Sequence, residues 1–414
     1  MSARRWLLVL GFGLGGMHAV PASASGALSA LPPEPVVRRV LENLPQFRLG
    51  MAAIDLADAE QAKLQAGPYE WTVRSSVSRR SVAPDARYAE QDLALERTMR
   101  WFGKAERDRA VGEKGREVAH ARHADMWHEA GRALLTDWFA ALRDSAAVER
   151  LQEQLQVARQ LHEVAATRVK AGDGAALEQR QAATEVLRVE ALLLQARQLQ
   201  DQSQALLDNH YPGLPAPVPG RLPAPQPDEQ ANGYWLAKIV NDNHEVELAQ
   251  AEADLAALRA SRVASDRMPD PTFAVRAARE RGGEERVLGL TISIAIPGPG
   301  RSADAAAAAI KARAAVQLLA QARTRVQSMA SRAVIDSTRS YQVWDSLREI
   351  EAQTAQQAQL LQRAYQGGEG SLADALAARR RALEAALLAQ AARIDALAAF
   401  ARVRLDAHLI WSID

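Results

Sequence analysis

Apolar residues recur along much of this chain at the spacing expected of packed helices. One series has intervals of 4, 7, 4, 7 and 3 residues: Leu372, Leu376, Leu383, Leu387, Ile394 and Leu397. A second has intervals of 4, 3, 7 and 4: Leu151, Leu155, Ala158, Ala165 and Val169. A period near 3.5 is typical of coiled-coil packing. We therefore predict long helices at 34–66, 103–170, 175–209, 230–266, 302–366 and 371–410.

A different pattern, strict alternation, fills the segment RVLGLTISIAIP at 286–297. Its large apolar residues occupy every second position: Leu288, Leu290, Ile292, Ile294 and Ile296. Such alternation predicts a β-strand with one apolar face. The segment 271–280 also alternates, and the intervening RGGEER is a hairpin-turn signal. Strands of about ten residues have the length of a tilted membrane-spanning strand.

The apolar face of this hairpin needs a cover. A soluble hairpin would pack that face on a core, but no other predicted element is left to provide one. We therefore expect lipid, or another copy of the chain, to cover it. A first-half hairpin at 70–80 and 91–101 alternates less regularly, with Arg97 on the face of Leu93 and Leu95. Lipid does not tolerate unpaired strand edges, so several chains would have to share one barrel.

Aromatic residues gather where the first-half hairpin meets the helices: Tyr69, Trp71, Trp101 and Phe102. They either form an aromatic belt at a membrane surface or pack the junction between strands and helices. The sequence leaves both interpretations open.

Landmarks repeat along the chain at nearly one offset. Gly172 and Gly368 are 196 residues apart, Gly103 and Gly300 are 197 apart, and the segment 43–73 matches 243–275 at an offset of 200 to 202. Three landmarks in one order predict two tandem units, each with a first helix, a hairpin, a long helix, a glycine turn and a return helix. We expect a signal peptide at 1–24, a first repeat at 25–210, a Pro-rich linker at 211–229 and a second repeat at 230–414.

Composition narrows the class of protein. Arg4 and Arg5, an apolar run and the Ala22–Ser23–Ala24 triplet predict a secretory signal peptide cleaved after Ala24. The balance of 51 Lys and Arg against 50 Asp and Glu, a net charge of +1, argues against a nucleic-acid partner. There is no cysteine, so disulfides and thiolate metal sites are excluded.

The sequence carries no motif for catalysis. It has no P-loop, nucleophile elbow or HExxH motif, so we expect neither an enzyme nor a cofactor. His120 and His123 share one helix face, but zinc-like sites need three or four ligands. We therefore expect no metal site.

In its order of elements the chain resembles the TolC family of outer-membrane efflux proteins over essentially its whole mature length. The family's tip pattern is matched in the second unit by Tyr365, Gly368, Asp374, Ala375 and Leu376. The first unit matches more loosely, with Val169, Gly172 and Glu178. The segment MPDPTF at 268–273 resembles the heavy-metal-efflux branch in particular.

The resemblance implies a mainly α fold with a small β part. Long coiled-coil helices would form a helical barrel in the periplasm, and the transmembrane hairpins of a homotrimer would form one shared β-barrel in outer-membrane lipid. The chain would be the passive exit duct of a tripartite, RND-type efflux system, with a periplasmic adaptor and an inner-membrane pump as partners. Small molecules would pass through it, with heavy-metal cations as the first expectation and drugs as the second.

The resemblance also implies site residues. The periplasmic tip that docks on the adaptor would include Gly172, Gly174, Gly367, Gly368, Gly370 and Leu372. Glu178 and Asp374 would form acidic rings at the pore constriction, or would simply be acids favoured in the first turn of a helix. Some family members link neighbouring helices through an arginine where this chain has Gly370.

A second class of protein stays open. A soluble periplasmic coiled-coil adaptor or structural protein would also be exported and helical. An adaptor would have one helical hairpin flanked by small β-domains, however, and would lack the long alternating strand.

Overall fold

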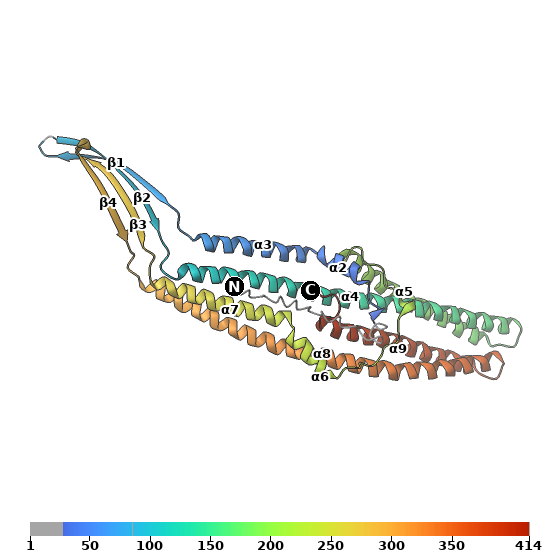
Figure 1. The fold of residues 1–414 in the computed structure, drawn as a ribbon. Coiled ribbons are helices and arrows are strands. Elements are labelled where there is room, and N and C mark those ends of the chain that lie inside the picture. Colours follow the sequence, from blue (N-terminus) through green and yellow to red (C-terminus); the bar gives the residue numbers. More distant parts are fainter. Residues whose placement is uncertain (1–27, 85, 414) are drawn as a thin grey trace, which may run out of the picture.

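The computed structural model describes residues 28–84 and 86–413. The predicted signal peptide therefore lies outside the described residues. The chain is elongated: a body of long helices carries a four-stranded sheet at one end and two helical turns at the other (Figure 1). The prediction of a mainly α fold with a small antiparallel sheet is confirmed.

Both halves of the chain place their elements in one order. The first half contains α2 (Glu34–Glu42), α3 (Pro45–Ala66), β1 (Thr72–Val82), β2 (Ala86–Thr98), α4 (Lys104–Lys170) and α5 (Ala176–His210). The second contains α6 (Asn232–Asn241), α7 (His244–Ala264), β3 (Thr272–Glu280), β4 (Glu285–Ser293), α8 (Pro299–Gln366) and α9 (Leu372–Asp406). Three single 3₁₀ turns are η1 (Pro219–Arg221), η2 (Ser265–Arg267) and η3 (Arg281–Gly283).

The first helix of each half is broken in two, which corrects the continuous helices predicted at 34–66 and 230–266. In the first half, Pro45 opens α3 at a position where its missing N–H costs nothing, whereas inside a helix it would remove a hydrogen bond. In the second half, Asn243 caps α7. Its Oδ1 atom accepts hydrogen bonds from the backbone N–H groups of Glu245 (3.1 Å) and Val246 (3.2 Å).

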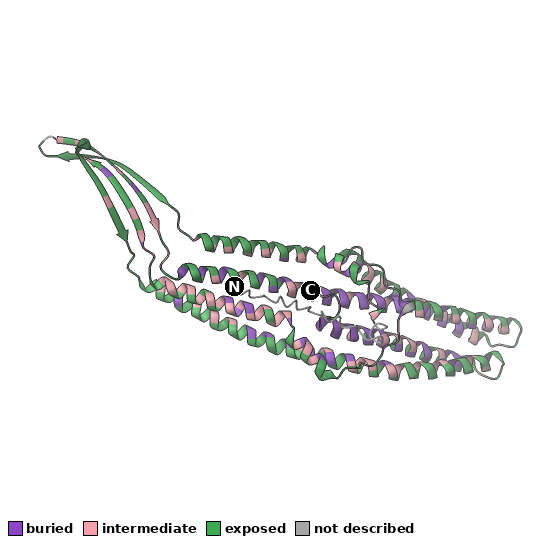
Figure 2. Cartoon of the chain, viewed as in Figure 1, coloured by how far each residue is buried: buried purple, intermediate pink, exposed green. Residues whose placement is uncertain are grey.

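The helices pack as hairpins against a central α4. Helix α4 lies along α5, and α8 lies along α9, while α3, α7 and α9 also contact α4. Buried residues line the facing sides of these helices and concentrate mid-body, whereas the strands are largely exposed (Figure 2). The largest core cluster includes Leu41, Trp127, Leu134, Trp138, Leu142, Leu397 and Trp411. In the part of the chain that the structure describes, no helix is long and apolar enough to cross a membrane.

The sheet joins the two halves. Its order is β1-β2-β3-β4, all antiparallel, so β2 of the first half pairs with β3 of the second. Leu95 lies opposite Val275 across that boundary. Strand β4 ends at Ser293, so Ile294 and Ile296, predicted within it, lie in the segment that follows the strand. There the chain leaves the ladder and turns into α8.

Candidate functional site

The two glycine turns at the end of the helical body have the same backbone design (Figure 1). Gly172 (φ 79°) and Gly368 (φ 82°) both adopt the left-handed conformation that favours glycine. The amide of Gly172 donates to the carbonyl oxygen of Val169 at 3.1 Å, and that of Gly368 to Tyr365 at 3.1 Å. A Cβ atom at either glycine would point into open space. Both turns therefore present bare backbone at the tip.

A second glycine in each turn is required for a close approach. A Cβ atom on Gly174 would lie 3.0 Å from the backbone nitrogen of Val169. A Cβ atom on Gly370 would lie 3.2 Å from the backbone nitrogen of Tyr365. The chain after each turn thus folds tightly against the helix before it. This close contact favours glycine at position 370.

Arg168 joins the two turns within one protomer. Its Nη1 atom donates a hydrogen bond to the carbonyl oxygen of Tyr365 at 3.0 Å, and its guanidinium carbon lies 5.0 Å from the centroid of the tyrosine ring. The Tyr365 hydroxyl donates to Glu178 Oε2 at 3.5 Å. The Tyr365 side chain is fully buried. Burial and the nearby Glu178 carboxylate raise the pKa of Tyr365, so the phenol stays protonated and continues to donate.

A second ionic link lies deeper in the body. Glu185 of α5 is buried and accepts a hydrogen bond from Arg380 Nε of α9 at 2.7 Å. Arg188 donates to both carboxylate oxygens of the same residue, at 2.7 and 3.1 Å. The two helical hairpins are therefore tied by charge at two levels. Sequence reasoning missed Arg168, Glu185 and Arg380, because each pairs with a partner almost 200 residues away.

The predicted tip residues have different surroundings. Leu372 is completely buried in a cluster with Leu161 and Tyr365, which corrects the expectation that it belongs to a docking surface. Asp374 is exposed and forms a capping pair with Ser371: the Asp374 amide donates to Ser371 Oγ at 3.1 Å, and the hydroxyl donates to Asp374 Oδ2 at 2.7 Å. Asp374 thus has the first-turn role, which leaves a pore role to be tested.

One face of the sheet has an apolar band between arginines, with Arg97 at the helix-proximal end and Arg79, Arg279 and Arg286 toward the far end, and the other face carries ion pairs. Cross-strand partners point to the same side, so the register defines each face. The first face carries exposed apolar residues from all four strands: Val73, Leu93, Leu95, Phe273, Val275, Leu288, Leu290 and Ile292. The opposite face carries the ion pairs Arg74–Glu96 and Arg276–Asp92. The less regular first-half hairpin therefore continues the apolar face of the second.

A buried lysine organises the junction between the strands and the helices. Lys104 Nζ lies 2.9 Å from Asp266 Oδ1 and 2.9 Å from Asp270 Oδ1, and it donates to the Met268 carbonyl oxygen at 2.7 Å. Asp270 also accepts from the hydroxyl of Tyr69 at 2.7 Å. The MPDPTF segment thus supplies two of these three partners of Lys104, Met268 and Asp270. Of the four junction aromatics, Tyr69 is tied into this network.

The other aromatics of the junction divide between packing and exposure. Trp71 and Phe102 are exposed, 61% and 89% of each residue being accessible. Trp101 is partly buried, and its backbone N–H donates to Asp270 Oδ1 at 2.8 Å. Trp71 and Phe102 are therefore the two that a membrane belt would use.

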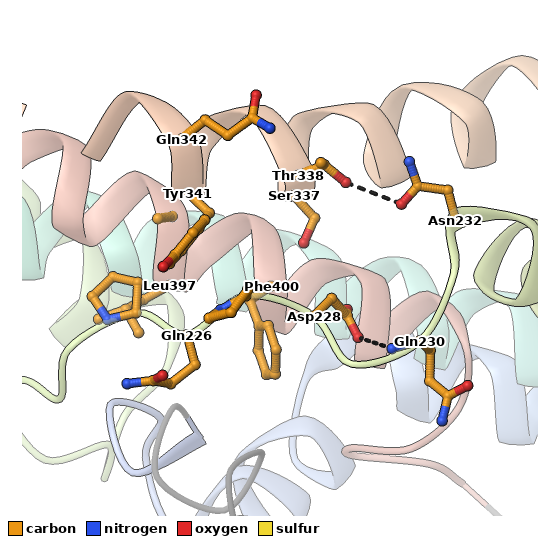
Figure 3. A pocket seen from close by; sticks show the side chains of 13 residues that line it. Gln226, Asp228, Gln230, Asn232, Ser337, Thr338, Tyr341, Gln342, Leu397 and Phe400 are labelled. Atoms are coloured by element: carbon orange, nitrogen blue, oxygen red, sulfur yellow. Dashed lines mark hydrogen bonds between the residues drawn. The ribbon is translucent and has the colours of Figure 1, made fainter. Parts of the chain in front are cut away.

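A cavity of about 220 Å³ lies where the linker crosses α8 and α9 (Figure 3). Mostly neutral groups line it, and two hydrogen bonds join lining residues: Thr338 Oγ1 donates to Asn232 Oδ1 at 3.1 Å, and the Gln230 amide donates to Asp228 Oδ1 at 3.2 Å. Asp228 also pairs with Arg404 at 2.6 Å. These contacts fasten the linker to the helices. Among the described residues, no cluster of three or more His, Asp or Glu residues is arranged to hold a metal ion.

Comparison with solved structures shows the fold. The outer membrane channel CmeC of Campylobacter jejuni has a TM-score of 0.76 at 12% identity, over 100% of this chain and 95% of that chain. The open state of the MtrE outer membrane channel of Neisseria gonorrhoeae has a TM-score of 0.72 at 16% identity, over 92% of this chain and 90% of that chain. The outer membrane protein VceC of Vibrio cholerae has a TM-score of 0.70 at 17% identity, over 92% of this chain and 99% of that chain. No family model and no curated protein matches the sequence.

Proposed function

We propose that this chain is one protomer of an outer-membrane exit duct for an efflux system. The observation that carries the proposal is the band of exposed apolar side chains that all four strands share on one face of the sheet, bounded by arginines toward both ends, with ion pairs on the opposite face. A membrane barrel needs this arrangement, apolar toward lipid and polar toward the lumen. The fold shared with outer membrane channels supports the same conclusion.

The sheet of one protomer leaves β1 and β4 as its edges. Unpaired backbone groups are costly in lipid, so the edges must pair with other copies of the chain. We expect a homotrimer, in which β4 of one copy pairs with β1 of the next. Twelve strands would close the barrel, and the helices of three copies would continue it as a periplasmic tunnel.

At the far end, the glycine turns are the proposed docking surface for a periplasmic adaptor that leads to an inner-membrane pump. Their bare backbone offers hydrogen-bonding groups without side chains in the way. The pump supplies the energy, so this chain needs no catalytic residues.

The contacts of Arg168 with Tyr365, and of Tyr365 with Glu178, hold the two hairpins of a protomer together at the tips. We propose that these contacts stabilise a closed entrance and that docking disrupts them. Three copies of Glu178 and of Asp374 near that entrance would favour cations. Heavy-metal cations are our first proposal for the exported substrate, because of the MPDPTF segment.

Cell fractionation tests the function. The account predicts the mature protein in outer-membrane fractions and, after detergent extraction, a mass of three chains. Recovery as a soluble periplasmic protein would contradict it and favour a coiled-coil structural role. A gene deletion profiled against metal salts and antibiotics then identifies the substrate. Sensitivity to metals alone supports metal export, whereas sensitivity to antibiotics alone contradicts it.

A further inference from the structure

Three histidine rings meet where α9 ends and α7 begins. His244 is the first residue of α7, and His408 lies two residues beyond α9. Their rings stack at a centroid distance of 4.4 Å with an interplanar angle of 14°. His128 of α4 completes the cluster, with its centroid 5.0 Å from His408 and 5.9 Å from His244. The cluster thus joins both halves of the chain.

The cluster occupies a mechanical joint. Helix α4 runs past the site, with α7 and α9 both packed against it (Figure 1). His408 holds φ at 59°, a left-handed conformation, where the chain turns away from α9. Beyond it, the Trp411 carbonyl oxygen accepts a hydrogen bond from Trp127 Nε1 of α4 at 2.7 Å. The His244–His408 stack is therefore a direct contact between the end of α9 and the start of α7.

A buried carboxylate, Asp406, lies beside His128 on one side of the cluster and is already paired with two arginines. Asp406 is 1% exposed and accepts hydrogen bonds from Arg132 Nε at 2.8 Å and from Arg402 Nε at 2.8 Å. Its Oδ1 atom lies 3.4 Å from His128 Nε2. Burial alone would raise the pKa of Asp406, but these three neighbours hold it well below its usual range. Because two guanidinium groups already pair with the Asp406 carboxylate, a protonated His128 would gain little further stabilisation from it.

Other charged groups face the cluster from each helix around it. Helix α4 contributes Asp125, Glu129 and Arg132; α7 contributes Glu245 and Glu247; α9 contributes Arg402 and Asp406; and α8 contributes Arg325, which pairs with Glu245. Glu247 Oε2 lies 3.5 Å from His244 Nδ1 but is itself exposed, so water screens it. Glu245 is paired to Arg325, and Asp125 of α4 is a further negative charge that acts on His244.

Protonation works against this packing. Imidazolium rings in contact repel each other, and a positive charge on His244 is also unfavourable at the N-terminus of a helix. Burial, reinforced by Arg132 and His244, lowers the pKa of His128 despite the contact with Asp406. An imidazole held neutral in the folded state costs stability as the pH falls through the ordinary histidine value of about 6.5, because the unfolded chain binds the proton first.

Asp125 titrates in the same pH range, but its protonation has the opposite effect on the stability of the folded state. Burial and the charges of Glu129 and Glu245 raise the pKa of Asp125 to about 6. Its protonation favours the folded state at acid pH, but it also removes the negative charge that faces His244. An Asp125→Asn variant removes this titration and so separates its effect from that of the histidines.

We propose that the joint between α9 and α7 is a pH-sensitive switch, in which protonation of the His128–His244–His408 cluster separates the end of α9 from the start of α7. Separation lets the two helices tilt independently along α4. The proposal depends only on the fold and the cluster, so it stands or falls separately from the export function.

Hydrogen–deuterium exchange of the purified full chain tests the switch. Peptides covering 244–250 and 403–411 are compared at pH 7.5 and 5.5, after correction for intrinsic rates. Opening coupled to the uptake of one proton grows up to about ten-fold per unit of pH. We expect selective acceleration at acid pH in these peptides, in the wild type and in Asp125→Asn. No acceleration in the wild type would overturn the proposal.

Variants decide whether the histidines are responsible. The double variant His244→Gln with His408→Asn removes both stacked rings, and asparagine tolerates the left-handed conformation at 408. We expect a smaller acid acceleration at 403–411 than in the wild type, because only His128 of the cluster remains. The control His120→Gln changes an exposed histidine of α4 and should behave like the wild type. Equal acid acceleration in the double variant would overturn the proposal.

A measurement on the unaltered protein covers the case in which the double variant fails to fold. Exchange of the histidine C2 protons, followed by mass spectrometry, titrates each ring. Burial predicts a titration curve for His128 displaced to more acid pH than the ordinary histidine value of about 6.5. A His128 curve at or above that value would contradict the switch.

Discussion

The Nη1 atom of Arg168 donates a hydrogen bond to the carbonyl oxygen of Tyr365 at 3.0 Å, across the two helical turns of the protomer. These residues end α4 and α8, which lie in different halves of the chain. A charged donor on a backbone acceptor beside a buried ring is worth more than an exposed ion pair. We propose that this contact sets the closed state of the entrance.

Replacing Arg168 with glutamine should weaken the closed tip by about 1–3 kcal/mol, because the Tyr365 carbonyl loses its charged donor. The expected result is a larger single-channel conductance in planar bilayers and easier entry of bulky antibiotics into cells. Arg159→Gln is the matched control, since Arg159 pairs with Glu190 inside one hairpin. Equal conductance in both variants would remove Arg168 from the gate.

Bulky side chains at the glycine turns test whether these turns form the docking surface. Valine at 370 brings a Cβ atom to 3.2 Å from the backbone nitrogen of Tyr365, so the turn must shift. Valine at 368 meets open space but forces a β-branched residue to a positive φ. We expect the double variant to form trimers yet to lose export, measured as substrate retention. Gly233→Val, an open site with ordinary backbone, should export normally. Export by the double variant would show that these turns are not the docking tip.

Removal of the buried lysine should damage the whole junction. Lys104→Met leaves the buried Asp270 without its cation, whereas Asp266, which is partly exposed, keeps its pair with Arg262. Removal of one partner of a buried ion pair costs about 3–5 kcal/mol. Thermal unfolding followed by circular dichroism should show a markedly lower midpoint. Lys114→Met removes a partly exposed lysine of the same helix and should cost less than about 1 kcal/mol. Similar midpoints for the two variants would mean that the Lys104 network adds little stability.

Asp374 offers a test of the acidic ring. Its carboxylate now caps α9 with Ser371, so Asp374→Asn keeps a capping side chain while removing the charge. If three copies line the constriction, the cation-to-anion permeability ratio should fall in bilayer recordings. Asp345→Asn, which removes an exposed acid of α8 far from the turns, is the control. An unchanged ratio in Asp374→Asn would limit Asp374 to capping.

Local patterns predicted the local elements. The glycines at 172 and 368 marked the turns, and the alternation from Leu288 to Ile292 marked a strand, because both signals are contained in a few consecutive residues. The break at Pro45 had its own signal, a proline at a helix start, which the longer helical period obscured. The strand was predicted to run to Ile296 because the alternation continues past the end of the ladder.

Contacts between the halves could not be predicted in this way. Lys104 looks like an ordinary helix-start lysine until the fold places Asp266 and Asp270 around it. Leu372 looks like part of an exposed turn until Tyr365 and Leu161 cover it. In each case the partners lie more than 150 residues away or on another helix, so only the packed structure determines burial and charge pairing.

We propose that lipid covers one face of the sheet and water the other. Because the natural chain has no cysteine, single cysteines at Leu290 and Thr291, neighbours on opposite faces of β4, can be spin-labelled without background. In outer membranes, we expect the label at 290 to collide with oxygen dissolved in lipid and the label at 291 to collide with a water-soluble nickel reagent. Labels at both positions that prefer the water-soluble reagent would contradict it.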